Sequence, residues 1–132
     1  MARARTMHQI ATMHVVIVDD SRLVRERLVE LLEGIADVEV VGQATSVAEG
    51  IAAVTALHPD FVLVDLKMPD GDGTAVLVAA KHLAHPPVVA MLTNYPFPQF
   101  RKRCLEAGAD FFWDKSRDFR RIPEALRRLA HV

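Results

Sequence analysis

The chain has 132 residues, of which 51% are hydrophobic and 25% are charged, which suits one folded domain and excludes a disordered polymer. Its formal net charge of −1 gives no global attraction for nucleic acid, and no apolar run approaches the ~20 residues that a membrane span needs. The single cysteine, Cys104, excludes an internal disulfide and is typical of a reducing compartment, so we expect a cytoplasmic protein. Residues 1–13 contain Arg3 and Arg5 but no long apolar stretch, so they are not a signal peptide, and we predict a flexible extension there.

Five apolar runs follow in chain order, and each is predicted to be a strand: residues 14–19, 38–44, 61–65, 87–93 and 110–115. Most are near-continuous runs of Val, Ile and Leu, which indicates strands buried on both faces of a parallel sheet. Between and after the strands, apolar residues recur at spacings of three and four, which predicts amphipathic helices. The residues with this spacing are Val24, Leu28, Leu31, Leu32 and Ile35; Val47, Ile51 and Val54; Val76, Leu77, Ala80 and Leu83; Phe100, Cys104 and Ala107; Ile122, Ala125, Leu126 and Leu129.

The five-fold alternation of strand and helix predicts a doubly wound, three-layer α/β domain over residues 14–132, because right-handed crossovers place helices on both faces of the sheet. Ser21 and Ser46 are predicted to begin helices, and Gly34 and Gly108 to end them. The fifth helix runs to the end of the chain, so we expect no second domain.

Polar side chains stand at the carboxyl ends of four predicted strands. Asp19 and Asp20 end the first strand, Asp65 the third, Thr93 the fourth and Lys115 the fifth. Doubly wound sheets bind ligands beyond the carboxyl ends of their strands, so we expect these five side chains to meet at one edge.

Three carboxylates in one cleft repel one another and need a cation, and oxygen-only ligands favour a hard ion such as Mg²⁺. A carboxylate held beside Mg²⁺ and the Lys115 ammonium group is a good in-line nucleophile, because these two positive charges neutralise the negative charge on the oxygens of a transferring phosphoryl group. The predicted chemistry is formation of an aspartyl phosphate, to which Thr93 could donate a hydrogen bond.

With these features the chain resembles the receiver domain of bacterial two-component response regulators. The resemblance extends from residue 14 to about residue 130 and rests on the pair Asp19-Asp20, Asp65 with Met68-Pro69 and Gly71, Thr93, and "GADFFWDK" leading to Lys115. It implies a flavodoxin-like (βα)5 fold with strand order 2-1-3-4-5, and a phosphoryl group received from a histidine kinase or phosphotransfer protein. "GADFFWDKSRDF" looks closest to receivers of the group that usually carries a helix-turn-helix output domain, whereas we expect a stand-alone receiver here.

The resemblance also implies a role for each acidic residue. Asp65 would be the phosphoacceptor. Asp20 and Asp65 would bind Mg²⁺ together with the backbone carbonyl of Lys67, and Asp19 would act mostly through water.

Thr93 and Lys115 would hold the phosphoryl group, and Thr93 would act in switching together with Phe112, which stands where the family has its switch aromatic. Phe112 lacks the hydroxyl of the more common tyrosine, so weaker switching is expected. Ser116 stands where many family members have proline, often in a cis peptide, and a cis bond to a non-proline residue costs about 2.5–4 kcal/mol, which leaves the geometry of this loop open. Asn94 replaces a residue that is commonly small, and it could either crowd the phosphate or hydrogen-bond to it.

Lys67 and Tyr95 lie two residues beyond Asp65 and Thr93, at positions that in the family tune how fast water reaches the phosphate. The bulk of Tyr95 predicts a shielded, slowly hydrolysed phosphoryl group.

The resemblance places the partner surface on the fourth helix, the fifth strand and the fifth helix. We expect an output partner or a second copy of the chain to bind there, and no direct binding of nucleic acid or membrane. An exposed Trp113 would favour a contact role. The residues expected on or near this surface are Arg101, Lys102, Arg103, Asp110, Trp113, Arg120 and Arg121.

Two functions compete with a phospho-receiver that catalyses only its own phosphorylation and dephosphorylation. One is a receiver-like interaction module that no longer switches, for which Ser116 and Asn94 are the support. The other is a small Mg²⁺ phosphatase, for which the chain lacks a cap domain and a separate acid/base beside the nucleophile. "DGDGT" at 70–74 looks like a haloacid-dehalogenase nucleophile motif, but Pro69 separates it from the strand end, so we interpret it as a Gly-rich turn.

Overall fold

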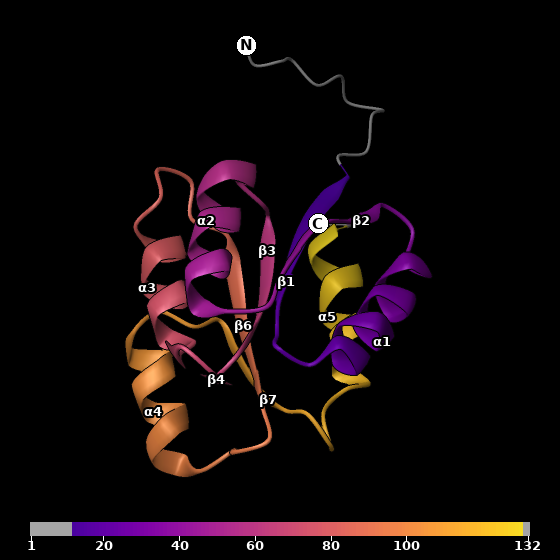
Figure 1. Cartoon of the computed structure of the whole chain (residues 1–132). Coiled ribbons are helices and arrows are strands. Elements are labelled where there is room, and N and C mark those ends of the chain that lie inside the picture. The colour runs from indigo at the N-terminus through magenta and orange to yellow at the C-terminus, as the bar shows by residue number, and fades with distance from the viewer. Residues whose placement is uncertain (1–11, 131–132) are drawn as a thin grey trace.

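The computed structural model of the chain describes residues 12–130. Its middle layer is a five-stranded parallel sheet with the order β2-β1-β3-β6-β7, as predicted, with β6 and β7 as the fourth and fifth long strands (Figure 1). The strands are β1 (Met13–Val18), β2 (Val38–Ala44), β3 (Phe61–Asp65), β6 (Val88–Thr93) and β7 (Phe111–Asp114). The predicted N-terminal extension lies outside the described residues, except for its last two positions, and Met13 already belongs to β1.

Within the described residues, two helices pack on one face of the sheet and three on the other, and Figure 1 shows the two groups. The pair is α1 (Arg22–Glu33) and α5 (Arg121–Ala130), and the three are α2 (Val47–Leu57), α3 (Thr74–Lys81) and α4 (Pro98–Glu106). No helix in the described part of the chain is long and apolar enough to cross a membrane.

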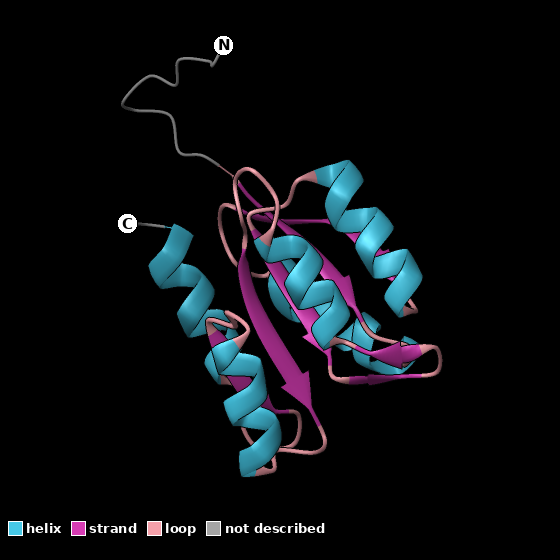
Figure 2. Cartoon of the chain, turned by 90° about the vertical axis from the view of Figure 1, so that its left-hand side faces the viewer, coloured by secondary structure: helices cyan, strands magenta, loops and turns pink. Residues whose placement is uncertain are grey.

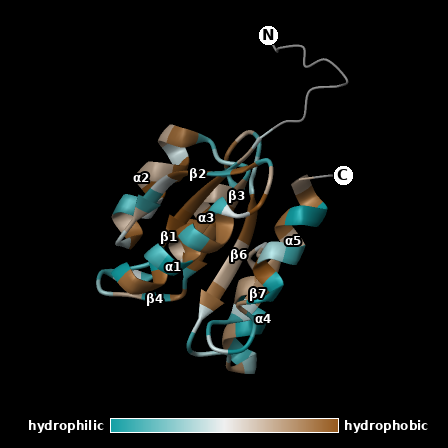
Figure 3. Ribbon diagram, turned by 90° about the vertical axis from the view of Figure 1, so that its right-hand side faces the viewer, coloured by the Kyte–Doolittle hydropathy of each residue, from teal (hydrophilic) through white to brown (hydrophobic). Residues whose placement is uncertain are grey.

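Successive residues of the strands contribute to two separate cores, one on each face. On the α1/α5 side, Ile17, Leu63 and Leu92 pack with Leu28 and Leu126. On the other side, strand residues that alternate with these pack under α2, α3 and α4. Figure 3 shows the result as apolar strands between helices with one apolar and one polar side. This two-sided burial explains why the strand sequences are continuously rather than alternately apolar.

The predicted helix starts are confirmed, because the Ser21 hydroxyl accepts a hydrogen bond from Val24 N and the Ser46 hydroxyl accepts one from Glu49 N. Gly34 caps the end of α1. Helix α4 ends at the Ala107 cap, and Gly108 follows with a φ of 108°, a backbone conformation that residues other than glycine rarely adopt.

A short hairpin that the sequence did not predict follows β3. Its strands are β4 (Lys67–Met68) and β5 (Gly71–Asp72), and Figure 2 shows them as two short arrows beside the sheet. The Asp70 carboxylate accepts hydrogen bonds from Val47 N and Ala48 N at 2.8 and 3.1 Å, so it caps the start of α2. The backbone amides of the helix terminus accordingly lower the pKa of Asp70.

Strand β7 lies at the edge of the sheet and pairs with β6 alone within residues 12–130. Two backbone groups of this strand are contacted by side chains of the chain itself. Asp114 N donates to the Asp118 carboxylate at 2.9 Å, and Arg101 Nη1 approaches the carbonyl oxygen of Phe112 at 3.5 Å. The outward-facing backbone groups of this strand are therefore partly occupied by the chain's own polar side chains.

Candidate functional site

The carboxyl edge of the sheet brings the predicted acidic residues together. Asp19 follows β1 directly and Asp65 ends β3, and each lies in the sheet layer with 1% and 6% of its surface exposed. Asp20, one residue later, is exposed. One carboxylate oxygen from each of the three lies within 4.8 Å of the other two. The predicted clustering of strand-end carboxylates is therefore observed.

Lys115 supplies the positive charge opposite these carboxylates. Its Nζ lies 2.8 Å from Asp19 Oδ2 and 3.4 Å from Asp65 Oδ2. The loop after β7 holds it there, because Lys115 N donates to the carbonyl oxygen of Thr93 at 2.8 Å. Both partner carboxylates are almost fully buried, so this ammonium group lies between two desolvated charges.

Asp19 is anchored on one oxygen only. Its Oδ1 accepts a hydrogen bond from Ser21 N at 2.8 Å, and its backbone carbonyl accepts one from Arg25 Nη1 at 2.9 Å. Its Oδ2 is buried and, within the described residues, accepts no hydrogen bond of good geometry; its close neighbour is the Lys115 ammonium group. A buried carboxylate oxygen with a single charged neighbour has coordination capacity left.

Asp65 is the carboxyl group whose environment is most unusual. Its burial, and then the nearby negative charge of Asp19, raise the pKa of Asp65 to about 7, while Lys115 acts in the opposite direction. Without a further cation, the ionised form of Asp65 is therefore disfavoured near neutral pH.

These residues fit a divalent cation. Three oxygen-only side chains converge, one of their oxygens is buried without a good hydrogen bond, and burial together with the charge of Asp19 raises the pKa of Asp65. Such a donor set is hard and acidic, as Mg²⁺ prefers.

The loop that carries Asp65 into the site depends on Gly73. Gly73 N donates to the carbonyl oxygen of Leu66 at 2.7 Å, and a Cβ at this glycine would lie 2.0 Å from the backbone oxygen of Asp65. The backbone of the hairpin therefore lies directly against the end of β3. Sequence reasoning assigned this glycine to a turn, and nothing in the letters "DGDGT" indicated which of the two glycines makes the close approach.

Thr93 is buried at the end of β6, where its hydroxyl accepts a hydrogen bond from Tyr95 N at 2.8 Å. Phe112 is 7% exposed and packs in the core under α2, α3 and α4. Both predicted switch residues therefore lie in the sheet layer near the site, with the aromatic ring turned inward.

Lys67 and Tyr95 lie close together. Lys67 Nζ lies 5.9 Å from the ring centroid of Tyr95 and 5.1 Å from that of Phe100, distances at which an ammonium group is attracted to an aromatic face. On the other side, Arg103 lies 5.3 Å from the ring of Phe100 and forms an ion pair with Asp72 at 2.7 Å. This chain of contacts connects the hairpin to the first turns of α4.

The loop after Lys115 has no cis peptide bond, and neither has any other described residue of the chain. Ser116 donates hydrogen bonds from its backbone N and its hydroxyl to Asp114 Oδ1, at 2.8 and 2.7 Å. These bonds lower the pKa of Asp114 and give the loop a regular turn without the family's proline.

On the predicted partner surface, Trp113 is 5% exposed, so the exposed tryptophan that would have favoured a contact role is not found. Its ring stacks on Phe111 with centroids 4.7 Å apart. Cys104 is buried in the core, as predicted.

The geometry is that of a doubly wound α/β domain with an acidic cluster and one lysine beyond the carboxyl ends of its strands. Residues 15–127 match the family model of the response regulator receiver domain. The response regulator protein VraR of Staphylococcus aureus is 35% identical over 119 residues, which cover 90% of this chain and 57% of that protein. The chain thus spans a little over half the length of the curated relatives it matches.

Solved structures of response regulator domains have the same fold as this chain. The receiver domain of the putative response regulator NarL from Mycobacterium tuberculosis superposes with a TM-score of 0.83 at 30% identity, covering 92% of this chain and 98% of that one. The response regulator domain of Thermotoga maritima CheB gives 0.79 at 26% identity, covering 91% and 94%. The chain therefore belongs to the response regulator receiver domain family of two-component signalling, in which phosphorylation of an aspartate is typical.

Proposed function

We propose that Asp65 is the phosphoacceptor of this receiver, and that Asp19, Asp20 and Asp65 hold a Mg²⁺ ion together with the backbone carbonyl of Lys67. The observation that carries the proposal is the convergence of three strand-end carboxylates within 4.8 Å of one another, with Lys115 Nζ between Asp19 and Asp65. The donor would be a phosphohistidine of a histidine kinase or phosphotransfer protein, or a small acyl phosphate.

In the proposed reaction, an oxygen of the ionised Asp65 attacks phosphorus in line with the leaving group. The bond from phosphorus to the donor's nitrogen or oxygen breaks, and the leaving group takes its electron pair. Lys115 binds an oxygen of the transferring group and Thr93 donates its hydroxyl proton to another in a hydrogen bond, so that the developing charge meets positioned donors. When bound, the cation would neutralise the remaining charge on the acidic cluster and on the phosphoryl oxygens.

The test is intact mass measurement after incubation with Mg²⁺ and acetyl phosphate. We expect a single adduct of about 80 Da, the mass of a phosphoryl group in place of a proton. The adduct should be absent from Asp65→Asn and present in the matched variant Asp37→Asn, which changes a carboxylate far from the site in a residue whose φ of 65° asparagine adopts readily. A folded wild-type protein that takes no phosphate would instead favour a receiver-like module that acts by interaction alone.

Phosphoryl lifetime tests the role of the aromatic cover. Tyr95→Ala should shorten the lifetime of the aspartyl phosphate about threefold to tenfold, because it removes both a bulky side chain and one of the two rings that position the Lys67 ammonium group. Phosphate release after removal of the donor measures this rate.

Phe97→Ala is the matched control for the lifetime measurement. It also removes an exposed aromatic ring from the β6–α4 loop, but this ring packs on Phe100 rather than on Lys67. An unchanged rate in Tyr95→Ala, or an equal increase in Phe97→Ala, would show that shielding by Tyr95 does not set the lifetime.

The output of the proposed switch would be a change in partner binding at α4, β7 and α5. Thr93, at the end of β6, and Phe112, in β7, would couple the site to this surface. We propose that the chain catalyses only its own phosphorylation and dephosphorylation, and that its signal is passed on by contact with an output partner or a second copy of the chain.

A further inference from the structure

The charges of this chain are strongly segregated along its length. Residues 98–130 contain nine Lys and Arg against five Asp and Glu, whereas the rest of the chain contains seven against twelve. The segment from α4 to α5 therefore carries a net charge of +4 in a protein whose total is −1. A near-neutral protein thus presents one clearly basic region, which a total charge does not reveal.

Much of the acidic charge in this region is already engaged. Asp110 accepts hydrogen bonds from Lys81 Nζ at 2.7 Å and from Val89 N at 2.8 Å. Asp118 binds Asp114 N, and its side chain is 15% exposed. These carboxylates hold the fold together and contribute little free negative charge at the surface.

The arginines beside them extend into solvent. Arg117, Arg121 and Arg128 have side chains that are 77%, 70% and 79% exposed. Their ion pairs within the chain are long, at 3.9, 3.4 and 3.7 Å, and such exposed pairs contribute little. These guanidinium groups are available to a partner at small cost.

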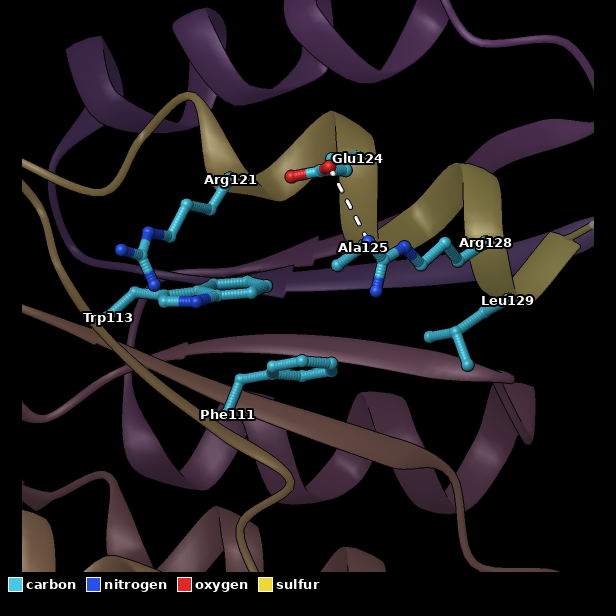
Figure 4. Close-up of a pocket in the computed structure, with 7 residues that line it drawn as sticks. All are labelled: Phe111, Trp113, Arg121, Glu124, Ala125, Arg128 and Leu129. Atoms are coloured by element: carbon cyan, nitrogen blue, oxygen red, sulfur yellow. Dashed lines mark ion pairs between the residues drawn. The ribbon is translucent and has the colours of Figure 1, made fainter.

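Two adjoining grooves give the basic region its shape. The first has a volume of about 450 Å³, with the stacked rings of Phe111 and Trp113 on the strand side and Leu129 and two arginines, Arg121 and Arg128, on the helix side (Figure 4). The second, of about 390 Å³, shares Phe111, Trp113 and Arg121 with the first and is lined mostly by polar groups. We call this surface the basic groove face; its residues are Arg101, Phe111, Trp113, Arg117, Arg121 and Arg128.

We propose that the basic groove face binds an acidic protein segment, with an apolar side chain of the partner in the groove over Phe111 and Trp113 and its carboxylates on Arg121 and Arg128. An apolar floor with guanidinium groups around it matches an apolar residue flanked by acids. Nucleic acid fits less well, because its phosphates and sugars would leave the apolar floor formed by Phe111 and Trp113 uncovered. The proposal rests on the proposed function only in identifying this segment as part of the output partner.

The probe is a fluorescein-labelled synthetic peptide in which leucines are flanked by glutamates. One comparison peptide replaces glutamate by lysine, and a second replaces leucine by serine. We expect the acidic leucine peptide to bind best in fluorescence anisotropy, more weakly as salt is raised, and to change the emission of Trp113, the chain's single tryptophan.

Charge-reversal variants locate the binding surface. Arg121→Glu should weaken binding at least about fivefold, because it replaces an attraction by a repulsion at the junction of both grooves. Arg127→Glu is the matched control: it makes the same charge change on the same helix but lines a separate groove between α1 and α5. We expect it to bind the peptide within about twofold of the wild-type protein, because Arg127 lines neither of the two grooves of the basic groove face.

Equal loss in Arg127→Glu, equal binding of the lysine peptide, or binding unaffected by loss of leucine would overturn the proposal. So would tighter binding of duplex DNA, or a dimer in sedimentation that Arg121→Glu dissociates, which would assign the face to nucleic acid or to a second copy. The peptide assay runs with and without acetyl phosphate. Binding without any phosphate adduct would contradict only the proposed phosphorylation, whereas an adduct without binding in either state would contradict only the basic groove face.

Discussion

Replacing Gly73 by alanine is expected to cost about 2–4 kcal/mol of unfolding free energy and to abolish phosphorylation. The added Cβ would lie 2.0 Å from the backbone oxygen of Asp65 and 3.0 Å from Val64 Cγ1, so the hairpin and the end of β3 have to move apart. The φ of Gly73 is −60°, so the effect comes from the close approach and not from an unusual backbone conformation. Denaturant unfolding and the mass assay with acetyl phosphate measure the two effects.

Gly34→Ala is the matched control for this change. A Cβ there meets Leu31 O at 3.6 Å, an ordinary contact, and the φ of −81° suits alanine. We expect its stability to change by no more than about 0.5 kcal/mol and its phosphorylation to be normal. A Gly73→Ala protein that is as stable and as readily phosphorylated as the wild type would show that the loop yields without cost.

The second large effect is a pH dependence of stability that resides in Asp65. Its pKa in the folded protein is about 7, whereas its ordinary value is 3.8, so between these values the folded state binds more protons than the unfolded state. The unfolding free energy should therefore fall as the pH rises from about 4 to about 7 in the absence of divalent cations, by up to about 4 kcal/mol. Below that window Asp65 is protonated in both states, and above it the full penalty is present.

Asp65→Asn should remove this slope and be more stable than the wild type at pH 8 without metal, because the amide carries no charge to bury. Asp37→Asn should keep the slope. Added Mg²⁺ should stabilise the wild type at pH 8 and stabilise Asp65→Asn less, since one of the proposed ligands is then changed. Thermal unfolding across this pH range measures all three. A wild-type protein whose stability rises with pH over the window would contradict the raised pKa.

The sheet could be predicted from the sequence because burial on both faces leaves a simple signal. Most of the long strands are near-continuous apolar runs, and β2 and β3 have the predicted bounds. The site followed from the sheet, since Asp65 and Thr93 end strands and a parallel sheet brings all carboxyl ends to one edge. The roles of these residues in phosphoryl transfer stay predictions until phosphorylation is measured.

Contacts between segments that are distant in the sequence leave no comparable pattern of apolar residues from which they could be predicted. The strands β4 and β5 have two residues each, which is too short to show a repeating pattern of apolar residues. The hydrogen bonds from Asp70 to the start of α2 join residues more than twenty positions apart in the sequence. The exposure of Trp113 depends on the positions of Phe111 and α5 around it. These positions cannot be predicted from the sequence of β7 alone. The trans peptide after Lys115 is the ordinary form for a bond to a non-proline residue such as Ser116, but the two hydrogen bonds from Ser116 to Asp114 that shape this loop are visible only in the fold.

The covered edge of β7 has a consequence for how copies of this chain meet at high concentration. An open edge strand offers a row of free amides and carbonyls, and two such edges join readily into one continuous sheet that can grow into aggregates. Here the Asp118 carboxylate occupies Asp114 N, and Arg101 stands over the Phe112 carbonyl. Neighbouring copies therefore cannot extend the sheet through this strand without first displacing both side chains, and association on this side is left to side-chain contacts, which can form and dissociate reversibly.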